Sequence, residues 1–185
     1  MRTLLVALGG LFIAACGGET MDPIDPNDPL ASYIPWDAER DGVQTTESGL
    51  QYVIVREGEE DGDMPGPRDR VSVMYDGRLV DGTVFDSSYE RGSSATFGVN
   101  QVISGWTEGL QLMSVGDEFI FYIPTELGYG DRPRPGGKIK PGDDQIFRVE
   151  LQQVVKAPEP RATDDAAWDQ YTPWNSDLPE IQKTG

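Results

Sequence analysis

The sequence predicts a small α+β domain in which one short amphipathic helix lies across a curved antiparallel sheet. Several stretches alternate apolar and polar residues with a period of two, which is typical of strands with one buried face. One stretch between them has the spacing of an amphipathic helix. The length of 185 residues is that of one domain with appendages.

The first half of the predicted sheet contains two strands and an extended stretch. Residues 50–55 mix Leu, Tyr, Val and Ile, a composition that suits a strand. In residues 71–75, Val, Val and Tyr alternate with Ser and Met, so we expect one buried face. Asp76-Gly77 and Asp81-Gly82 are turn dipeptides, and residues 83–85 then resume an extended conformation.

Two further strands are expected nearer the C-terminus. In residues 119–123, Phe, Phe and Ile occupy every second position, and Pro124 stops the strand because it has no N–H to donate. Residues 146–151 alternate once more and lead toward Val155.

The helical candidate lies between these two groups of strands. Trp106, Leu110 and Met113 recur at helical spacing and form a single apolar face. Ser104 is a suitable N-cap, and Gly116 is a suitable end. We expect this helix to cover one face of the sheet.

Composition and charge exclude several classes of function. The chain holds 32 acidic and 15 basic residues, a formal net charge of -17, one cysteine and no histidine. The lack of histidine removes Ser-His and Cys-His nucleophile pairs, a histidine general base and His-ligated zinc. One cysteine allows no internal disulfide and no cysteine-rich metal cluster. The negative charge argues against a nucleic-acid or anionic-lipid surface, so we expect no cofactor, metal or nucleic-acid partner.

Residues 1–15 have the features of a bacterial lipoprotein signal peptide. One positive charge at Arg2 precedes an apolar stretch that is shorter than a membrane span of about 20 residues. The stretch ends in Ile-Ala-Ala before Cys16 and resembles a lipobox, in which the cysteine is lipidated and becomes the new N-terminus. Acyl chains at Cys16 would hold the protein to a membrane without a spanning helix. The alternative is ordinary signal cleavage nearby, with Cys16 incidental.

Two polar segments flank the predicted domain. Residues 16–42 are acidic and rich in Asp-Pro pairs, so we expect an extended, self-repelling tether. Residues 157–185 form a polar tail that holds three aromatic residues between positions 168 and 174. These aromatic residues either dock on the domain or bind a partner. The folded domain is therefore expected within residues 43–156.

Five strings of residues in this central segment point to a known family. They are Ser48–Tyr52 (SGLQY), Val84–Tyr89 (VFDSSY), Gln101–Leu110 (QVISGWTEGL), Leu127–Gly130 (LGYG) and Phe147–Leu151 (FRVEL). Together and in this order they closely resemble the FKBP-type peptidyl-prolyl cis-trans isomerases, in the bacterial extracytoplasmic branch. The resemblance covers about residues 46–155.

The resemblance implies an FKBP-like antiparallel half-barrel sheet wrapped around the short helix, with a shallow apolar pocket between them. Trp106 is its implied floor, and the backbone N–H of Ile103 is implied to meet a ligand carbonyl. Asp86 is implied to lie beside the substrate carbonyl. The implied catalytic residues are Tyr75, Asp86 and Tyr129, and the implied substrate-binding residues are Phe85, Phe97, Val102, Ile103, Trp106, Ile139 and Phe147.

The implied reaction suits a chain without histidine. Rotation about an X-Pro bond breaks no covalent bond and moves no proton, but amide resonance imposes a barrier of about 18–20 kcal/mol. The twisted transition state has a less dipolar carbonyl, so an apolar aromatic pocket favours it over the planar ground states. We expect Trp106 and Phe147 to contribute mainly binding, and Tyr75, Asp86 and Tyr129 to orient the twisting amide.

The loop after the LGYG string departs from the family pattern. Residues 131–141 carry one acid and four bases. The bases are Arg132, Arg134, Lys138 and Lys140. They belong either to a solvated loop or to a positive surface that steers acidic client segments into the pocket. Lys140 and Gln145 are more polar than is usual in the family, so we expect a wetter rim and weaker binding of macrolide inhibitors.

The leading hypothesis is a prolyl isomerase that assists the folding of exported proteins. We expect a lipid-anchored monomer in the bacterial cell envelope, on the periplasmic face of the outer membrane or on the cell surface. Its expected partners are proline-containing exported polypeptides and macrolide inhibitors. One alternative is a chaperone module that binds proline-containing peptides without catalysis. A surface adhesin that uses the aromatic tail is a third class.

Overall fold

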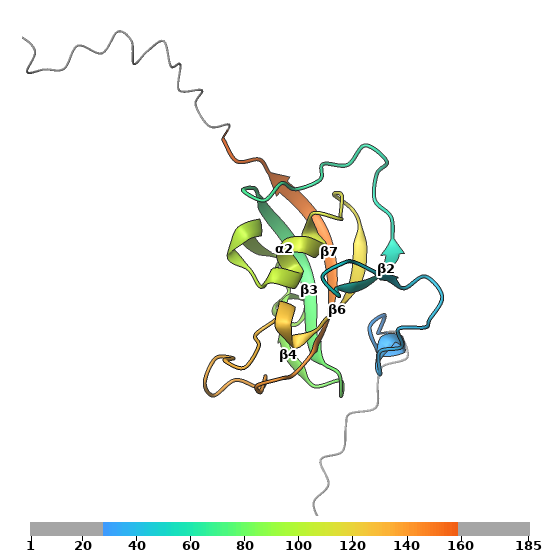
Figure 1. The fold of residues 1–185 in the computed structure, drawn as a ribbon. Coiled ribbons are helices and arrows are strands. Elements are labelled where there is room, and N and C mark those ends of the chain that lie inside the picture. Colours follow the sequence, from blue (N-terminus) through green and yellow to red (C-terminus); the bar gives the residue numbers. More distant parts are fainter. Residues whose placement is uncertain (1–27, 159–185) are drawn as a thin grey trace, which may run out of the picture.

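A twisted antiparallel sheet of seven strands dominates the structure, a computed structural model that describes residues 28–158 (Figure 1). The strand order is β1-β2-β6-β7-β3-β4, and β5 also pairs with β3. The strands are β1 (Gln44–Thr45), β2 (Gln51–Arg56), β3 (Arg70–Leu79), β4 (Val84–Ser87), β5 (Ala95–Gly98), β6 (Glu118–Ile123) and β7 (Gln145–Val155). The helical elements are α1 (Ser88–Arg91), α2 (Ser104–Leu110) and the 3-10 turns η1 (Ala31–Tyr33), η2 (Val99–Gln101) and η3 (Thr125–Leu127). The predicted α+β class is confirmed.

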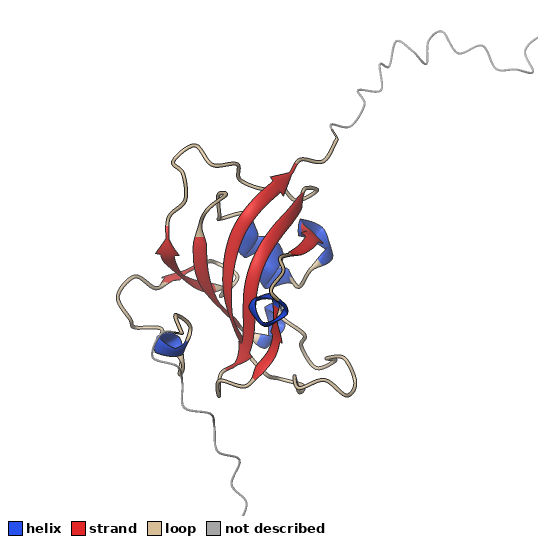
Figure 2. Cartoon of the chain, turned by 180° about the vertical axis from the view of Figure 1, so that it is seen from behind, coloured by secondary structure: helices blue, strands red, loops and turns tan. Residues whose placement is uncertain are grey.

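The alternation of residues along the central strands separates the two faces of the sheet. In β6, Phe119, Phe121 and Ile123 pack into the main core together with Trp106 and Leu110 of α2. Ile120 and Tyr122, the intervening residues of β6, belong to a second cluster on the opposite face of the sheet. Figure 2 shows this face of the sheet in front, with α2 behind it. The period of two in the sequence therefore predicted correctly which side chains meet the helix.

Two glycines let α2 lie close to this face. A Cβ on Gly105 would come within 2.7 Å of Ile123, and one on Gly109 within 2.6 Å of Phe121. Both distances are below van der Waals contact, so the axis of the helix can approach β6 only because these positions lack side chains.

The helix ends differ from the prediction. Ile103, not Ser104, is the N-cap, and no side chain caps the first turn. The helix stops at Leu110, six residues before Gly116, whose φ of +96° belongs to the turn that leads into β6. Met113 is fully buried although it lies beyond the helix, because the turns after Leu110 return it to the core. The spacing had identified the buried residues but not the element that carries the last of them.

Asp76-Gly77 was predicted as a turn and lies instead inside β3, where it pairs with both β4 and β7. The Asp76 carboxylate is bound by Arg78 and does not close a turn. Gly77 is required by packing, since a Cβ there would come within 2.7 Å of Phe147 and 2.8 Å of Phe85. The glycine thus makes room for two aromatic rings of the pocket described below.

Residues 28–42, assigned to the tether in the sequence analysis, pack against the sheet. Leu30 is fully buried with Ile120 and Ile146, on the face opposite to α2. Trp36 stacks on Tyr122 with ring centroids 5.5 Å apart, and its indole N–H donates to a side-chain oxygen of β2 at 2.6 Å. Because this segment is acidic and rich in Asp-Pro pairs, its composition did not indicate that these apolar residues are buried. The folded unit extends toward the N-terminus at least to residue 28.

Several predictions concern residues outside the described range. The signal peptide, Cys16, residues 16–27 and the aromatic tail beyond residue 158 fall there, so they stay predictions. Across residues 28–158, no helix has the length and apolar character needed to span a bilayer.

Candidate functional site

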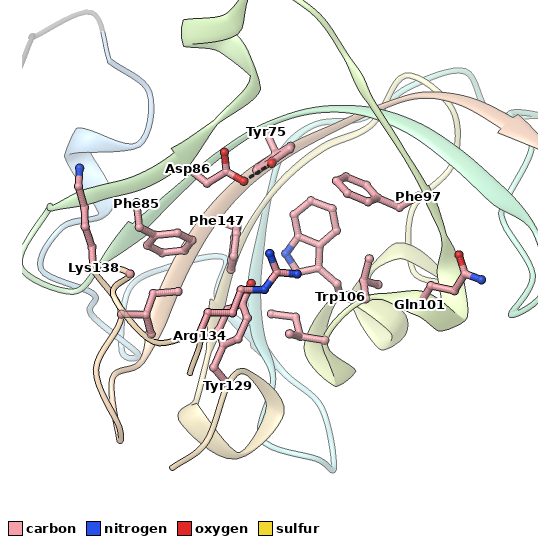
Figure 3. A pocket seen from close by; sticks show the side chains of 14 residues that line it. Tyr75, Phe85, Asp86, Phe97, Gln101, Trp106, Tyr129, Arg134, Lys138 and Phe147 are labelled. Atoms are coloured by element: carbon pink, nitrogen blue, oxygen red, sulfur yellow. Dashed lines mark hydrogen bonds between the residues drawn. The ribbon is translucent and has the colours of Figure 1, made fainter. Parts of the chain in front are cut away.

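A pocket of about 560 Å³ opens between α2, the strands β3, β4 and β7, and the loop that precedes β7 (Figure 3). All ten predicted catalytic and substrate-binding residues line it, although they come from seven separate parts of the sequence. They are Tyr75, Phe85, Asp86, Phe97, Val102, Ile103, Trp106, Tyr129, Ile139 and Phe147. The curvature of the sheet around α2 brings them together.

Trp106 forms the centre of the aromatic lining. Tyr75, Phe97 and Phe147 surround its ring edge to face, at centroid distances of 5.3, 5.6 and 5.3 Å. This arrangement suits the ring quadrupoles and fixes the indole plane. Trp106 is only 5% exposed, and its indole nitrogen is buried with no acceptor among the described residues. The walls are therefore apolar, and one unpaired donor remains at the floor.

A charged network closes one side of the pocket. The Tyr75 hydroxyl donates to the Asp86 carboxylate, and Arg91 at the end of α1 forms an ion pair with the same carboxylate. Arg91 also donates to the Tyr75 hydroxyl oxygen at 3.0 Å. Three elements, β3, β4 and α1, thus hold one carboxylate in a defined orientation.

These contacts set the protonation states of the network. Burial opposes ionisation of Asp86, but the hydrogen bonds from Tyr75 and Arg91 outweigh it and lower the pKa of the carboxyl below its ordinary 3.8. Burial, together with the hydrogen bond to Asp86, raises the pKa of Tyr75 to about 12. At neutral pH the network therefore consists of a neutral phenol, a carboxylate and a guanidinium.

Two donors on the opposite side of the pocket have no partner among residues 28–158. Tyr129 lies just after η3, and its hydroxyl makes no hydrogen bond within residues 28–158. Burial raises the pKa of this phenol, so it stays protonated. The backbone N–H of Ile103, at the N-cap of α2, also has no acceptor in this range. Both groups are free to meet a ligand carbonyl.

The basic loop contributes unequally to the pocket. Arg134 and Lys138 line it, whereas Arg132 and Lys140 do not. The Lys138 ammonium donates to the Val84 carbonyl at 2.5 Å, which fixes it beside β4. Two of the four predicted basic residues therefore stand at the mouth.

Gln145 was expected at a polar rim and lies instead in the interior. It is fully buried at the start of β7, and its side-chain nitrogen donates to the carbonyl of Asp143. A Cβ on Gly128 would come within 2.1 Å of its side-chain oxygen, so the amide is enclosed by the neighbouring loop. Gln145 lies in the interior because β7 pairs with β3 on one side and with β6 on the other. Its amide is therefore not part of the pocket rim and does not make the rim more polar.

Two participants were not assigned by sequence reasoning. Arg91 lies five residues after Asp86, and only the short helix α1 returns its side chain to the carboxylate. Gln101 lines the pocket from η2, next to the residues that were assigned. Neither residue has a sequence signal of its own, because exposed Arg and Gln side chains are common on protein surfaces and do not by themselves indicate a site.

The arrangement suits recognition of an apolar ring that carries carbonyl groups. The aromatic lining can accommodate the ring, and the free N–H of Ile103 and the hydroxyl of Tyr129 can donate to its carbonyl oxygens. In residues 28–158, no three His, Cys, Asp or Glu side chains gather where they could hold a metal ion. The groups present supply desolvation, orientation and an electric field.

Comparisons with known proteins agree with this geometry. Residues 62–152 match the family model described as FKBP-type peptidyl-prolyl cis-trans isomerase. The chain is 48% identical over 123 residues to the FKBP-type 22 kDa peptidyl-prolyl cis-trans isomerase of Escherichia coli K12, an alignment that covers 66% of this chain and 58% of that protein. It is 44% identical over 126 residues to the outer membrane protein MIP of Legionella longbeachae, covering 68% and 53% of the two chains. The chain thus spans little more than half the length of these curated relatives.

A solved structure is similar over nearly its whole length. The peptidyl-prolyl cis-trans isomerase from Pseudomonas syringae shares 31% identity with a TM-score of 0.60, and the match covers 68% of this chain and 90% of that one. A second solved structure, that of AtFKBP13, shares 34% identity with a TM-score of 0.55, and the match covers 61% of this chain and 98% of that one. The predicted FKBP-like fold is therefore confirmed.

Proposed function

Because this chain belongs to the FKBP-type peptidyl-prolyl cis-trans isomerase family, we propose that it catalyses cis-trans isomerisation of X-Pro bonds in exported polypeptides. The observation that carries the proposal is the pocket: an aromatic lining around Trp106 with polar groups along its edges. Proline-containing polypeptides are the substrates that this family's activity implies.

In the proposed mechanism, the prolyl ring lies against Trp106 and between Phe97 and Phe147. Withdrawal of the amide from water disfavours its planar, dipolar form relative to the twisted transition state. The Ile103 N–H and the Tyr129 hydroxyl hold carbonyl oxygens on either side of the turning bond. The ionised Asp86 provides a fixed field beside the carbonyl as its charge distribution changes. No step transfers a proton.

We further propose that the protein acts in the bacterial cell envelope, anchored by lipid at Cys16. The signal-peptide and lipobox features of residues 1–16 support this location, and one relative is named an outer membrane protein. A lipid anchor would keep the pocket near polypeptides that emerge from the export machinery.

A protease-coupled assay tests the proposed activity. Purified protein lacking the signal is added to a short X-Pro peptide whose trans form alone is cleaved, and the cis-to-trans rate is measured with and without a macrolide inhibitor. We expect a rate that rises with enzyme concentration and falls when the inhibitor occupies the pocket. Binding of the peptide by calorimetry without any acceleration would instead support a non-catalytic chaperone module.

A further inference from the structure

The pocket contains more hydrogen-bond donors and positive charge than it can satisfy by itself. The indole N–H of Trp106, the backbone N–H of Ile103 and the Tyr129 hydroxyl have no acceptor among the described residues. Arg134 and Lys138 add two cations at the mouth, where Figure 3 shows the guanidinium of Arg134 extending into the pocket. Buried donors in proteins are normally paired, so such a surplus favours a ligand rich in acceptors.

Asp86 is the one carboxylate that lines the pocket, and its charge is already compensated. Arg91 forms an ion pair with one of its oxygens, and the Tyr75 hydroxyl donates to the other. Arg134 and Lys138, in contrast, form no ion pair with any described carboxylate. The net charge presented to a ligand at the mouth is therefore positive, in a chain whose formal net charge is -17.

Two acidic residues that follow this loop, Asp143 and Asp144, are engaged elsewhere, and Asp131 within the loop does not line the pocket. Asp144 accepts from the Tyr122 hydroxyl and from the backbone N–H of Thr125 at 2.9 Å. Asp143 accepts from the backbone N–H of Lys140 at 2.7 Å. Glu90 lines a smaller hollow beside Phe85 together with Asp86 and Lys138, and it does not line the pocket itself. None of these carboxylates lines the pocket, so none competes there with a substrate anion.

We propose that this pocket selects X-Pro bonds in which X is Asp or Glu, through Arg134 and Lys138. The inference rests on the proposed isomerase function and names the substrate class of the same site. In the proposed binding mode, Tyr129 holds the carbonyl of residue X, the residue before proline, and Arg134 lies beside Tyr129 in the pocket lining (Figure 3). The positive charge of Arg134 also opposes the rise in the pKa of the Tyr129 phenol, so the side chain of residue X would lie near Arg134. Arg132 and Lys140 belong to the same loop but lie outside the lining, so they do not take part.

Peptides of the form Ala-X-Pro-Phe with X as Glu, Gln or Lys test this selectivity. We expect kcat/KM for Glu to exceed that for Gln by about three- to fivefold, as for one or two exposed ion pairs, with Lys below Gln. The preference should be clear at about 0.05 M salt and largely lost at about 0.5 M salt, because exposed charges are screened. Equal values for Glu and Gln would overturn the proposal.

Paired variants separate the pocket residues from the general charge of the loop. The double variant Arg134→Gln/Lys138→Gln should bring the Glu-to-Gln ratio to about one, and Arg134→Gln alone should lower it without disturbing Lys138's bond to β4. The matched control, Arg132→Gln/Lys140→Gln, removes the same charge from the same loop. Its ratio of kcat/KM for the Glu peptide to that for the Gln peptide should equal that of the wild type. An equal loss in the control would contradict selection at the pocket.

Calorimetric dissociation constants for the same peptides keep the two proposals separate. A protein that isomerises no peptide yet binds the Glu peptide more tightly, through Arg134 and Lys138, would refute the isomerase and retain the selectivity. Isomerisation of all peptides at one rate, with equal affinities, would refute the selectivity and retain the isomerase.

Discussion

Asp86 and Trp106 line the same pocket but differ in the physical work that we assign to them. Asp86 is about half exposed at the side chain and acts through its charge, whereas Trp106 is buried and acts through its apolar surface. The prolyl ring does not change as the amide turns, so the contact of Trp106 with this ring stabilises bound substrate and transition state to similar extents and mainly affects KM. A fixed charge beside a carbonyl whose dipole changes affects kcat.

This difference gives a prediction for kinetic constants. Asp86→Asn keeps the shape of the side chain, removes its charge, and should lower kcat on an X-Pro peptide by about ten- to a hundredfold with little change in KM. Trp106→Phe keeps an aromatic floor of smaller area and should mainly raise KM. Full progress curves over a range of cis-peptide concentrations separate the two constants. Wild-type kinetics in both variants would show that the site has been misassigned.

The network around Asp86 also predicts a pH dependence. Its pKa is lowered because the hydrogen bonds from Tyr75 and Arg91 favour the carboxylate more than burial opposes it. The charged form, and the stability that it contributes, is therefore present above the ordinary Asp value and is lost as the pH falls through the depressed folded value. The isomerisation rate should stay level from pH 7 to about pH 5 and decline only below the ordinary pKa of 3.8.

Tyr75→Phe is the control for that profile. It removes one hydrogen bond to the carboxylate, so the pKa of Asp86 should rise and the acid limb of the rate profile should move to higher pH. Circular dichroism at each pH separates loss of activity from unfolding. An unchanged acid limb in this variant would mean that Asp86 is not the titrating group.

At the scale of elements, sequence periodicity predicted the sheet and the helix because each has one buried face. The strands β2, β3, β6 and β7 lie where alternation placed them, and the helix lies where Trp106 and Leu110 recur. The pattern misplaced the helix ends and read the Asp76-Gly77 dipeptide as a turn. At Gly77, the close approach of Phe147 and Phe85, which no local pattern records, requires a glycine inside the strand.

Seven of the ten predicted pocket residues occur in the five strings, and the family resemblance implied the other three, Tyr75, Phe97 and Ile139. The electrostatic setting of these residues was not predictable from the sequence. The separation of Arg134 and Lys138 from Arg132 and Lys140 depends on how the loop folds over β4. The fully buried Gln145 likewise reads as polar and exposed until the pairing of β7 is known. Pattern identifies residue types, but three-dimensional packing determines which charges remain unpaired.

The segment before β1 provides a prediction about stability. Leu30 is fully buried on the face of the sheet away from the pocket. Leu30→Ala should therefore lower the free energy of unfolding by about 2–3 kcal/mol, near the low end for a buried leucine because this cluster is small. Urea unfolding measures the loss, and kcat/KM well below the unfolding transition should not change.

Leu112→Ala is the matched control for this variant. Leu112 is 38% exposed, so its truncation should change the free energy of unfolding by no more than about 0.5 kcal/mol. If Leu30→Ala were equally harmless, residues 28–42 would behave as the extended tether that their composition suggested. The comparison thus decides where the folded unit begins.

At the scale of the whole molecule, the packing of residues 28–42 limits how far a lipid anchor could hold the domain from a membrane. A tether over residues 16–42 could extend to about 90 Å, whereas residues 16–27 can span at most about 40 Å. An anchor at Cys16 would therefore keep residue 28, where the packed segment begins, within about 40 Å of the bilayer.

The anchor itself is tested by one substitution in the full-length chain. Cys16→Ser removes the thiol that a lipoprotein needs for acylation, so the protein should lose incorporated radiolabelled palmitate and move from the membrane fraction to the soluble fraction. Its kcat/KM on short peptides should equal that of the wild type, because residues 28–158 contain the packed segment, the sheet and the complete pocket. Refolding of a large membrane-associated client should slow, since the local concentration of the isomerase would fall. A Cys16→Ser protein that stays in the membrane fraction would refute the lipid anchor without affecting the isomerase.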